Sequence, residues 1–98
     1  MCKVEIIKSR RAGKKLTAKF TNCKDGEIKL VHFGASGMSD FTKHGDEERK
    51  QRYIARHSNN RENWNDPYSA GALSRYILWN KHTLEESIKD YKKRFNFN

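Results

Sequence analysis

The residues best suited to chemistry lie in one polar segment, residues 32–57. Asp40, His44 and His57 are the side chains there that could converge on a divalent metal ion, whose bound water would attack a phosphodiester. The segment has neither a Cys-x-x-Cys pair nor a His-Glu-x-x-His sequence, so its spacing matches no established metal motif. A structural alternative is favoured: a capped helix with an ion-pair network around Asp40 and Arg49 or Arg52. We therefore expect no metal ion, no cofactor and no catalytic residue.

Two shorter features are weaker still. Residues 34–37 (GASG) resemble a phosphate-binding loop, but the Lys-Ser/Thr that completes such a loop is missing. Cys2 and Cys23 have no metal-ligand spacing and do not form a dense disulfide framework, which favours reduced thiols in a reducing compartment. Neither feature predicts a reaction.

Basic residues provide the stronger signal. The chain has 21 Lys and Arg against 12 Asp and Glu, a net charge of +9, and residues 1–24 hold eight of the bases but only one acid. Such a concentrated positive field attracts polyanions, among which nucleic acid is the first candidate. The competing interpretation is a solvated charge run that protects sheet edges. The candidate phosphate contacts are Lys3, Lys8, Arg10, Arg11, Lys14, Lys15, Lys19, Lys24, Lys29, Lys92, Lys93 and Arg94.

The elements that must position these bases begin with three strands, in an antiparallel meander over about residues 3–33. Apolar residues alternate with polar ones at Val4/Ile6, at Leu16/Ala18/Phe20 and at Ile28/Leu30, the period expected when one face of a sheet is buried. This phase predicts that Lys3, Lys19 and Lys29 lie on the outer face. The turn over residues 10–15 would then carry a basic hairpin tip.

Three C-terminal helices should pack against the sheet, at about residues 45–57, 67–79 and 84–95. Asp66-Pro67 offers an N-cap followed by Pro at the first helical position, and residues 83–86 match a capping box. Tyr76 and Trp79 have helical spacing, which favours the core over base stacking, whereas Trp64 in a loop could do either. The 98 residues should form a single α+β domain, and no stretch approaches the ~20 apolar residues of a membrane span.

Two long segments also resemble a known group of proteins. Residues 32–44 (HFGASGMSDFTKH) and 48–57 (ERKQRYIARH), followed by 64–67, 70–81 and 87–95, are similar to a family of small basic, mostly uncharacterised proteins encoded by giant, mimivirus-like DNA viruses. The resemblance spans about residues 28–95. It implies a location in the virion interior and, during infection, in the viral factory of the host cytoplasm.

These observations together predict sequence-independent binding and condensation of double-stranded DNA through its phosphates, for packaging a viral genome. Affinity would come largely from counterion release, with a slope of log affinity against log salt near −5 if about six phosphates are contacted. Condensation needs two binding faces or a homo-oligomer, with Trp64, Phe97 and the last helix as candidate contacts. The alternatives are a small metal-dependent enzyme acting on nucleic acid and an internal virion protein that binds acidic protein partners.

Overall fold

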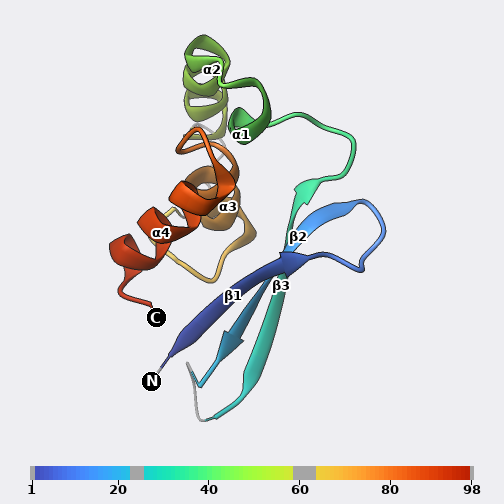
Figure 1. Ribbon diagram of the computed structural model, residues 1–98, viewed down its shortest axis with the longest axis vertical. Coiled ribbons are helices and arrows are strands. Elements are labelled where there is room, and N and C mark those ends of the chain that lie inside the picture. The colour runs from blue at the N-terminus through green and yellow to red at the C-terminus, as the bar shows by residue number, and fades with distance from the viewer. Residues whose placement is uncertain (1, 23–25, 59–63, 98) are drawn as a thin grey trace.

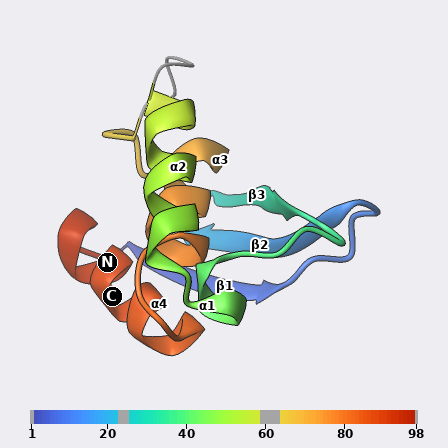
Figure 2. The same ribbon diagram turned by 90° about the horizontal axis from the view of Figure 1, so that it is seen from above.

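The computed structural model describes residues 2–22, 26–58 and 64–97. Its sheet forms one layer and its helices gather along one side of that layer (Figure 1). Seen from above, the strands extend away from the helices, and the turn between the first two strands is the part farthest from them (Figure 2). The predicted α+β class, with a three-stranded sheet followed by helices, is confirmed.

The sheet is the predicted antiparallel meander, in the order β1-β2-β3. Its strands are β1 (Lys3–Lys8), β2 (Lys14–Thr21) and β3 (Ile28–Ala35), so the third strand continues two residues beyond the predicted end. Gly13 has a φ of 83° in the β1–β2 turn, a backbone conformation that residues with a Cβ rarely adopt. This turn closes the hairpin that carries the basic tip.

The predicted phase of β3 is wrong. Ala18 pairs with Val31 and Leu16 with Phe33, which puts Val31 and Phe33 on the core face, and Ile28 and Leu30 on the outer face at 60% and 54% exposed. The sequence of β3 is apolar in both phases, and packing against the helices selects the phase that buries the larger Phe33, which is fully buried. Lys29 consequently faces the helical side, with its ammonium 5.4 Å from the centre of the Tyr68 ring.

The first predicted helix, at about residues 45–57, forms and is preceded by a short helix that the sequence did not predict. α1 (Phe41–His44) is capped by the Asp40 side chain and ends at Gly45, whose φ is 61°. α2 (Glu47–Ser58) then begins after Asp46, whose carboxylate accepts the backbone N–H groups of Glu48 and Arg49 at 3.0 and 3.3 Å. The positive φ at Gly45 allows the chain to change direction between them.

The second helix starts later than predicted and changes type. α3 (Ala70–Leu73) is capped by Ser69, and it continues into the π-helical segment η1 (Ser74–Leu78). Asp66 and Pro67 stay in the preceding turn, where the Tyr91 hydroxyl donates to the Pro67 carbonyl at 2.5 Å. The last helix, α4 (Leu84–Phe95), has the predicted bounds and the predicted Thr83 cap.

The core lies between the sheet and the C-terminal helices. Phe20, Phe33 and Tyr91 are fully buried in it, and Phe97 stacks on Tyr91 with ring centres 5.6 Å apart. Burying a phenol in this apolar setting raises the pKa of Tyr91 far above its ordinary value. Phe97 is partly buried and packs against the core of this chain, and its role as a contact for self-association stays a prediction.

Two further findings concern the whole described chain. Cys2 is disulfide-bonded, unlike the expected reduced thiol, and Cys23 lies outside the described residues. No helix among the described residues is long and apolar enough to cross a membrane.

Candidate nucleic-acid interface

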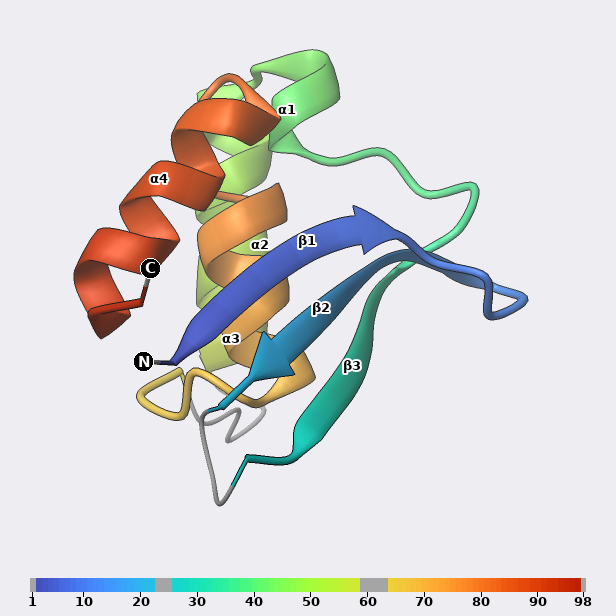
Figure 3. The same cartoon turned by 60° about the horizontal axis from the view of Figure 1, so that its bottom comes forward.

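The β1–β2 hairpin reaches out from the body of the protein as a basic arm (Figure 3). Lys8, Arg10, Arg11 and Lys14 lie on it and are exposed. Lys43 of α1 lines a shallow hollow of about 340 Å³ together with Lys8 and Lys14. We call these five cations the arm cluster. No ion pair between described residues involves any of them, so their charge is available to an external anion.

Lys15 differs from its basic neighbours because it forms an ion pair inside the protein. Its Nζ lies 2.6 Å from the Asp40 carboxylate, and the two side chains are 13% and 2% exposed. Asp40 also accepts the backbone N–H of Thr42 at 3.0 Å and a bond from the Thr42 hydroxyl. The pair thus ties the start of β2 to the start of α1. Lys15 is the partner of Asp40, where the sequence suggested Arg49 or Arg52.

The charge state of Asp40 follows from these contacts. Burial alone would raise the pKa of this carboxyl, but the hydrogen bonds from Lys15 and Thr42 and the charge of Lys15 outweigh burial and lower it below 3.8. Asp40 is therefore ionised at neutral pH, and its charge is compensated inside the protein. It subtracts little from the positive field of the arm cluster.

A second hollow lies on the other side of the Lys15–Asp40 pair. This α2 pocket has a volume of about 300 Å³ and lies between the ends of β2 and β3, the 38–40 connection, α2 and α3. Its cationic lining is Lys14, Lys15 and Arg56, His57 also lines it, and its apolar lining includes Met38 and Leu78. Arg56 is exposed and, like the arm cluster, has no ion pair among the described residues.

Gly34 sets how closely the sheet approaches the helices at both hollows. Its φ is 79°, and a Cβ there would come within 2.7 Å of Leu78 Cδ1 and 3.3 Å of Lys15 Cβ. Gly37 also has a positive φ, 86°, but nothing lies within 4 Å of its added Cβ. It provides a control for the backbone effect alone.

Gly34→Ala should lower the free energy of unfolding more than Gly37→Ala does. Both substitutions impose the left-handed conformation on alanine, at about 1–2 kcal/mol, and only Gly34→Ala adds a steric cost, of about 1–3 kcal/mol. Urea unfolding followed by circular dichroism measures both. Equal losses would mean that the close approach of Gly34 to Leu78 contributes nothing to stability.

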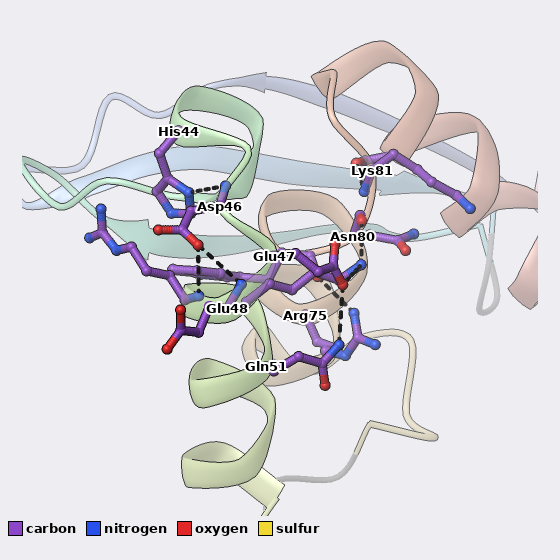
Figure 4. A network of polar contacts seen from close by, with 12 residues as sticks. His44, Asp46, Glu47, Glu48, Gln51, Arg75, Asn80 and Lys81 are labelled. Carbon is purple, nitrogen blue, oxygen red and sulfur yellow. Dashed lines mark hydrogen bonds and ion pairs between the residues drawn. The ribbon is translucent and has the colours of Figure 1, made fainter.

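The three candidate metal ligands, Asp40, His44 and His57, have separate structural roles. The Nδ1 of His44 accepts the backbone N–H of Asp46 at 2.9 Å (Figure 4), and its ring packs against Phe41 and Trp79. His57 stacks on Tyr53 with ring centres 4.1 Å apart. Nowhere in residues 2–22, 26–58 and 64–97 do three or more His, Cys, Asp or Glu side chains gather as a metal site would require. The polar residues of 32–57 in large part cap and join α1 and α2.

The remaining predicted phosphate contacts fall in different places. Lys3 and Lys19 lie on the outer face of the sheet, as the register shows, whereas Lys29 is on the other face. Lys24 lies outside the described residues. Lys92 and Lys93 are in the last turn of α4, at the end of the molecule where both termini lie (Figure 1). Arg94 packs over the Tyr76 ring at 4.4 Å and contacts Asp90 at 3.4 Å.

Trp79 and Tyr76 pack inside the protein, in agreement with the core interpretation. Trp79 stacks on Tyr53 with ring centres 4.4 Å apart and an angle of 6°, and Tyr76 meets the ring of Phe95. The Arg75 guanidinium lies 5.6 Å from the Trp64 ring and donates to the Trp79 carbonyl at 2.8 Å. Arg75 and Asn80 thereby satisfy carbonyl groups at the end of η1 (Figure 4).

Sequence reasoning missed Lys43 and Arg56. Lys43 joins the arm cluster through the fold of the connection after β3, in which the Ser36 backbone N–H donates to the Gly13 carbonyl at 2.9 Å. Arg56 lines the α2 pocket together with Lys14, although 42 positions separate them in the chain. No local pattern could have signalled either placement.

Comparison of the chain with known protein families finds a match. A protein-family model described as "Family of unknown function (DUF5754)" matches residues 4–57. No curated protein and no solved structure matches the chain.

Proposed function

Since the chain belongs to the DUF5754 family, whose description names no activity, we propose a function from its surface: sequence-independent binding and condensation of double-stranded DNA. The arm cluster is the observation that carries this proposal. Four of its cations share the protruding hairpin, and Lys43 lines a hollow with two of them; the one carboxylate in the lining of that hollow, Asp40, is neutralised by Lys15. Phosphate groups are the ligands that such a surface fits, because Lys and Arg can reach them without being desolvated heavily.

The shape of the arm favours backbone contact over base reading. Arg10 and Arg11 are in the turn of the hairpin, and Lys8 and Lys14 flank it. Phosphate contacts position a protein on the duplex and carry no sequence information directly. Unrelated duplexes should therefore bind alike.

Condensation requires a second basic surface, and the far end of the molecule supplies one. β1 separates the arm from the end at which α4 stops (Figures 1 and 3). A six-residue strand such as β1 spans about 17 Å, so Lys92 and Lys93 are too far from the arm to serve the same phosphates. Two separated basic ends allow one molecule to bridge two DNA segments. The sequence resembles proteins of giant DNA viruses, and we propose that in such a virus this bridging packages the genome in the virion.

A salt series with and without the second basic end tests both parts of the proposal. Five phosphate contacts predict a slope of log affinity against log salt of about −4.5 for any duplex sequence. The variant Lys92→Glu/Lys93→Glu should still bind a single short duplex, but should no longer compact long DNA. Fluorescence anisotropy measures the affinity, and light scattering measures the compaction.

Two results would contradict the proposal. Absence of duplex binding at low salt, about 50 mM, would remove the DNA-binding function. Unchanged compaction by Lys92→Glu/Lys93→Glu would show that α4 is not the second contact. The matched control is Arg49→Glu/Arg52→Glu, which changes the charge equally at two exposed residues of α2, outside both basic ends.

A further inference from the structure

We propose that the α2 pocket binds a nucleotide, with the base against its apolar wall and the phosphate between Lys14 and Arg56. This goes beyond duplex binding, because a base inside a duplex is stacked and cannot enter a pocket. The pocket has a volume of about 300 Å³, at the lower end of the range for small-molecule sites.

The first support for the proposal is the charge of the lining. Lys14 comes from β2 and Arg56 from α2, so two elements distant in sequence bring their cations to one cavity. The one carboxylate in the lining, Asp40, is held by Lys15 at 2.6 Å. The pocket therefore carries an uncompensated positive charge, to which a phosphate is complementary.

The second support is the apolar wall. Met38 lines the pocket and, at 65%, is the most exposed of the large apolar side chains among the described residues. Leu78 and the stacked pair Tyr53 and Trp79 line the pocket as well. A flexible thioether adapts readily to a flat apolar partner, which favours a nucleobase over a purely ionic ligand.

Two structural features hold the pocket open in this form. The Lys15–Asp40 pair fixes the 38–40 connection to β2, and the stacking of Tyr53 on Trp79 fixes α2 to the end of η1. A pocket whose walls are held by such contacts needs little rearrangement on binding. Two sources of the ligand fit equally: a free mononucleotide, or an unpaired nucleotide at the end of a nucleic-acid strand.

Titration with defined ligands, followed by NMR shifts and calorimetry, tests the site. The ligands are the four deoxynucleoside monophosphates, the matching nucleosides, inorganic phosphate and decanoate. We expect saturable binding of the monophosphates. Arg56→Glu should weaken it about tenfold or more, because a charge-assisted hydrogen bond becomes a repulsion. Met38→Ser should weaken monophosphate binding but leave phosphate binding unchanged.

The matched control for charge is Arg49→Glu. Arg49 is on the same helix, two turns before Arg56, it is exposed, and it lines neither hollow. It should leave monophosphate binding within about twofold of the unaltered protein, because seven helical residues place it about 10 Å along the helix from Arg56, near the screening length. Since Arg49→Glu and Arg56→Glu change the net charge equally, both should bind a blunt duplex alike. Nucleotide binding in the pocket can therefore be absent while duplex binding is present, and the reverse, so the two proposals are tested separately.

A second pair of ligands identifies the source. If a duplex with a single-stranded overhang binds more tightly than a blunt duplex, and Arg56→Glu removes this gain, the pocket takes an unpaired nucleotide of a strand. If only the free monophosphates bind, it takes a small molecule. The proposal is overturned if monophosphates do not bind at millimolar concentration, if inorganic phosphate or decanoate binds as well as they do, or if Arg56→Glu binds them unchanged.

Discussion

Asp40→Asn should lower the free energy of unfolding by about 2–4 kcal/mol, because removing one partner of a buried ion pair leaves the other partner's charge uncompensated. Lys15 would then hold its ammonium at 13% exposure without its carboxylate. We expect a loss of stability in the lower part of the range for buried ion pairs, because Lys15 retains some contact with water. Asparagine can still accept the Thr42 N–H, so the substitution tests the charge and not the cap of α1. Urea unfolding at pH 7 measures the loss.

Acid should remove the difference between the two proteins. The pKa of Asp40 is lower in the folded protein than its ordinary value of 3.8, so its stabilising contribution is fully present above that value. This contribution is lost as the pH falls through the lowered pKa, where the folded protein takes up the proton. The stability curves of Asp40→Asn and the unaltered protein should therefore converge below about pH 4.

Asp46→Asn is the matched control for this prediction. Asp46 is exposed and caps α2 through its backbone N–H contacts, which asparagine can also accept. Its substitution should lower the free energy of unfolding by less than about 1 kcal/mol. If Asp40→Asn lowers the free energy of unfolding at pH 7 no more than Asp46→Asn does, the Lys15–Asp40 pair does not stabilise the attachment of the connection to the sheet.

Reversing the charge of the arm should reduce duplex affinity by a factor of about 10³ or more at low salt. The variant Arg10→Glu/Arg11→Glu/Lys14→Glu removes three phosphate contacts and replaces them with repulsions. Each phosphate contact contributes about 0.9 to the salt slope, so the slope should become shallower by about 2.7. Anisotropy across a salt series measures both quantities.

Lys15 is kept in this variant for a structural reason. Lys15→Glu would place a second carboxylate beside the buried Asp40, and weaker binding could then reflect unfolding. Arg49→Glu/Arg52→Glu/Lys89→Glu changes the net charge equally at residues outside the arm. If this control loses as much affinity as the arm variant, the net charge of the protein, and not the arm, governs binding.

Local patterns predicted the elements whose signals are unambiguous. The alternation at Val4/Ile6 and Leu16/Ala18/Phe20 fixed the faces of β1 and β2, and the Thr83 cap fixed the start of α4. β3 could not be predicted in this way, because Ile28/Leu30 and Val31/Phe33 offer two competing phases. The choice between them is made by burial against helices that come later in the chain.

The candidate site was predictable only where its residues are neighbours in sequence. The run of bases around the first hairpin turn is sufficient by itself to indicate the arm. The pairing of Asp40 with Lys15 spans 25 positions, and the α2 pocket brings Lys14 and Arg56 together over 42, separations that no local period encodes. Lys15 shows the difference: by sequence it is one of four equivalent bases at the turn, and the fold makes it the internal counter-ion of Asp40.

The composition of the core has a consequence for the family segment, residues 4–57. Phe20 and Phe33 within that segment are covered by Leu73, Ile77 and Tyr91, which all come after it. The part of the chain by which the family is recognised thus contributes one half of a shared interior. The family match therefore ends before the folding unit does, and a fragment cut at residue 57 would present its aromatic interior to water.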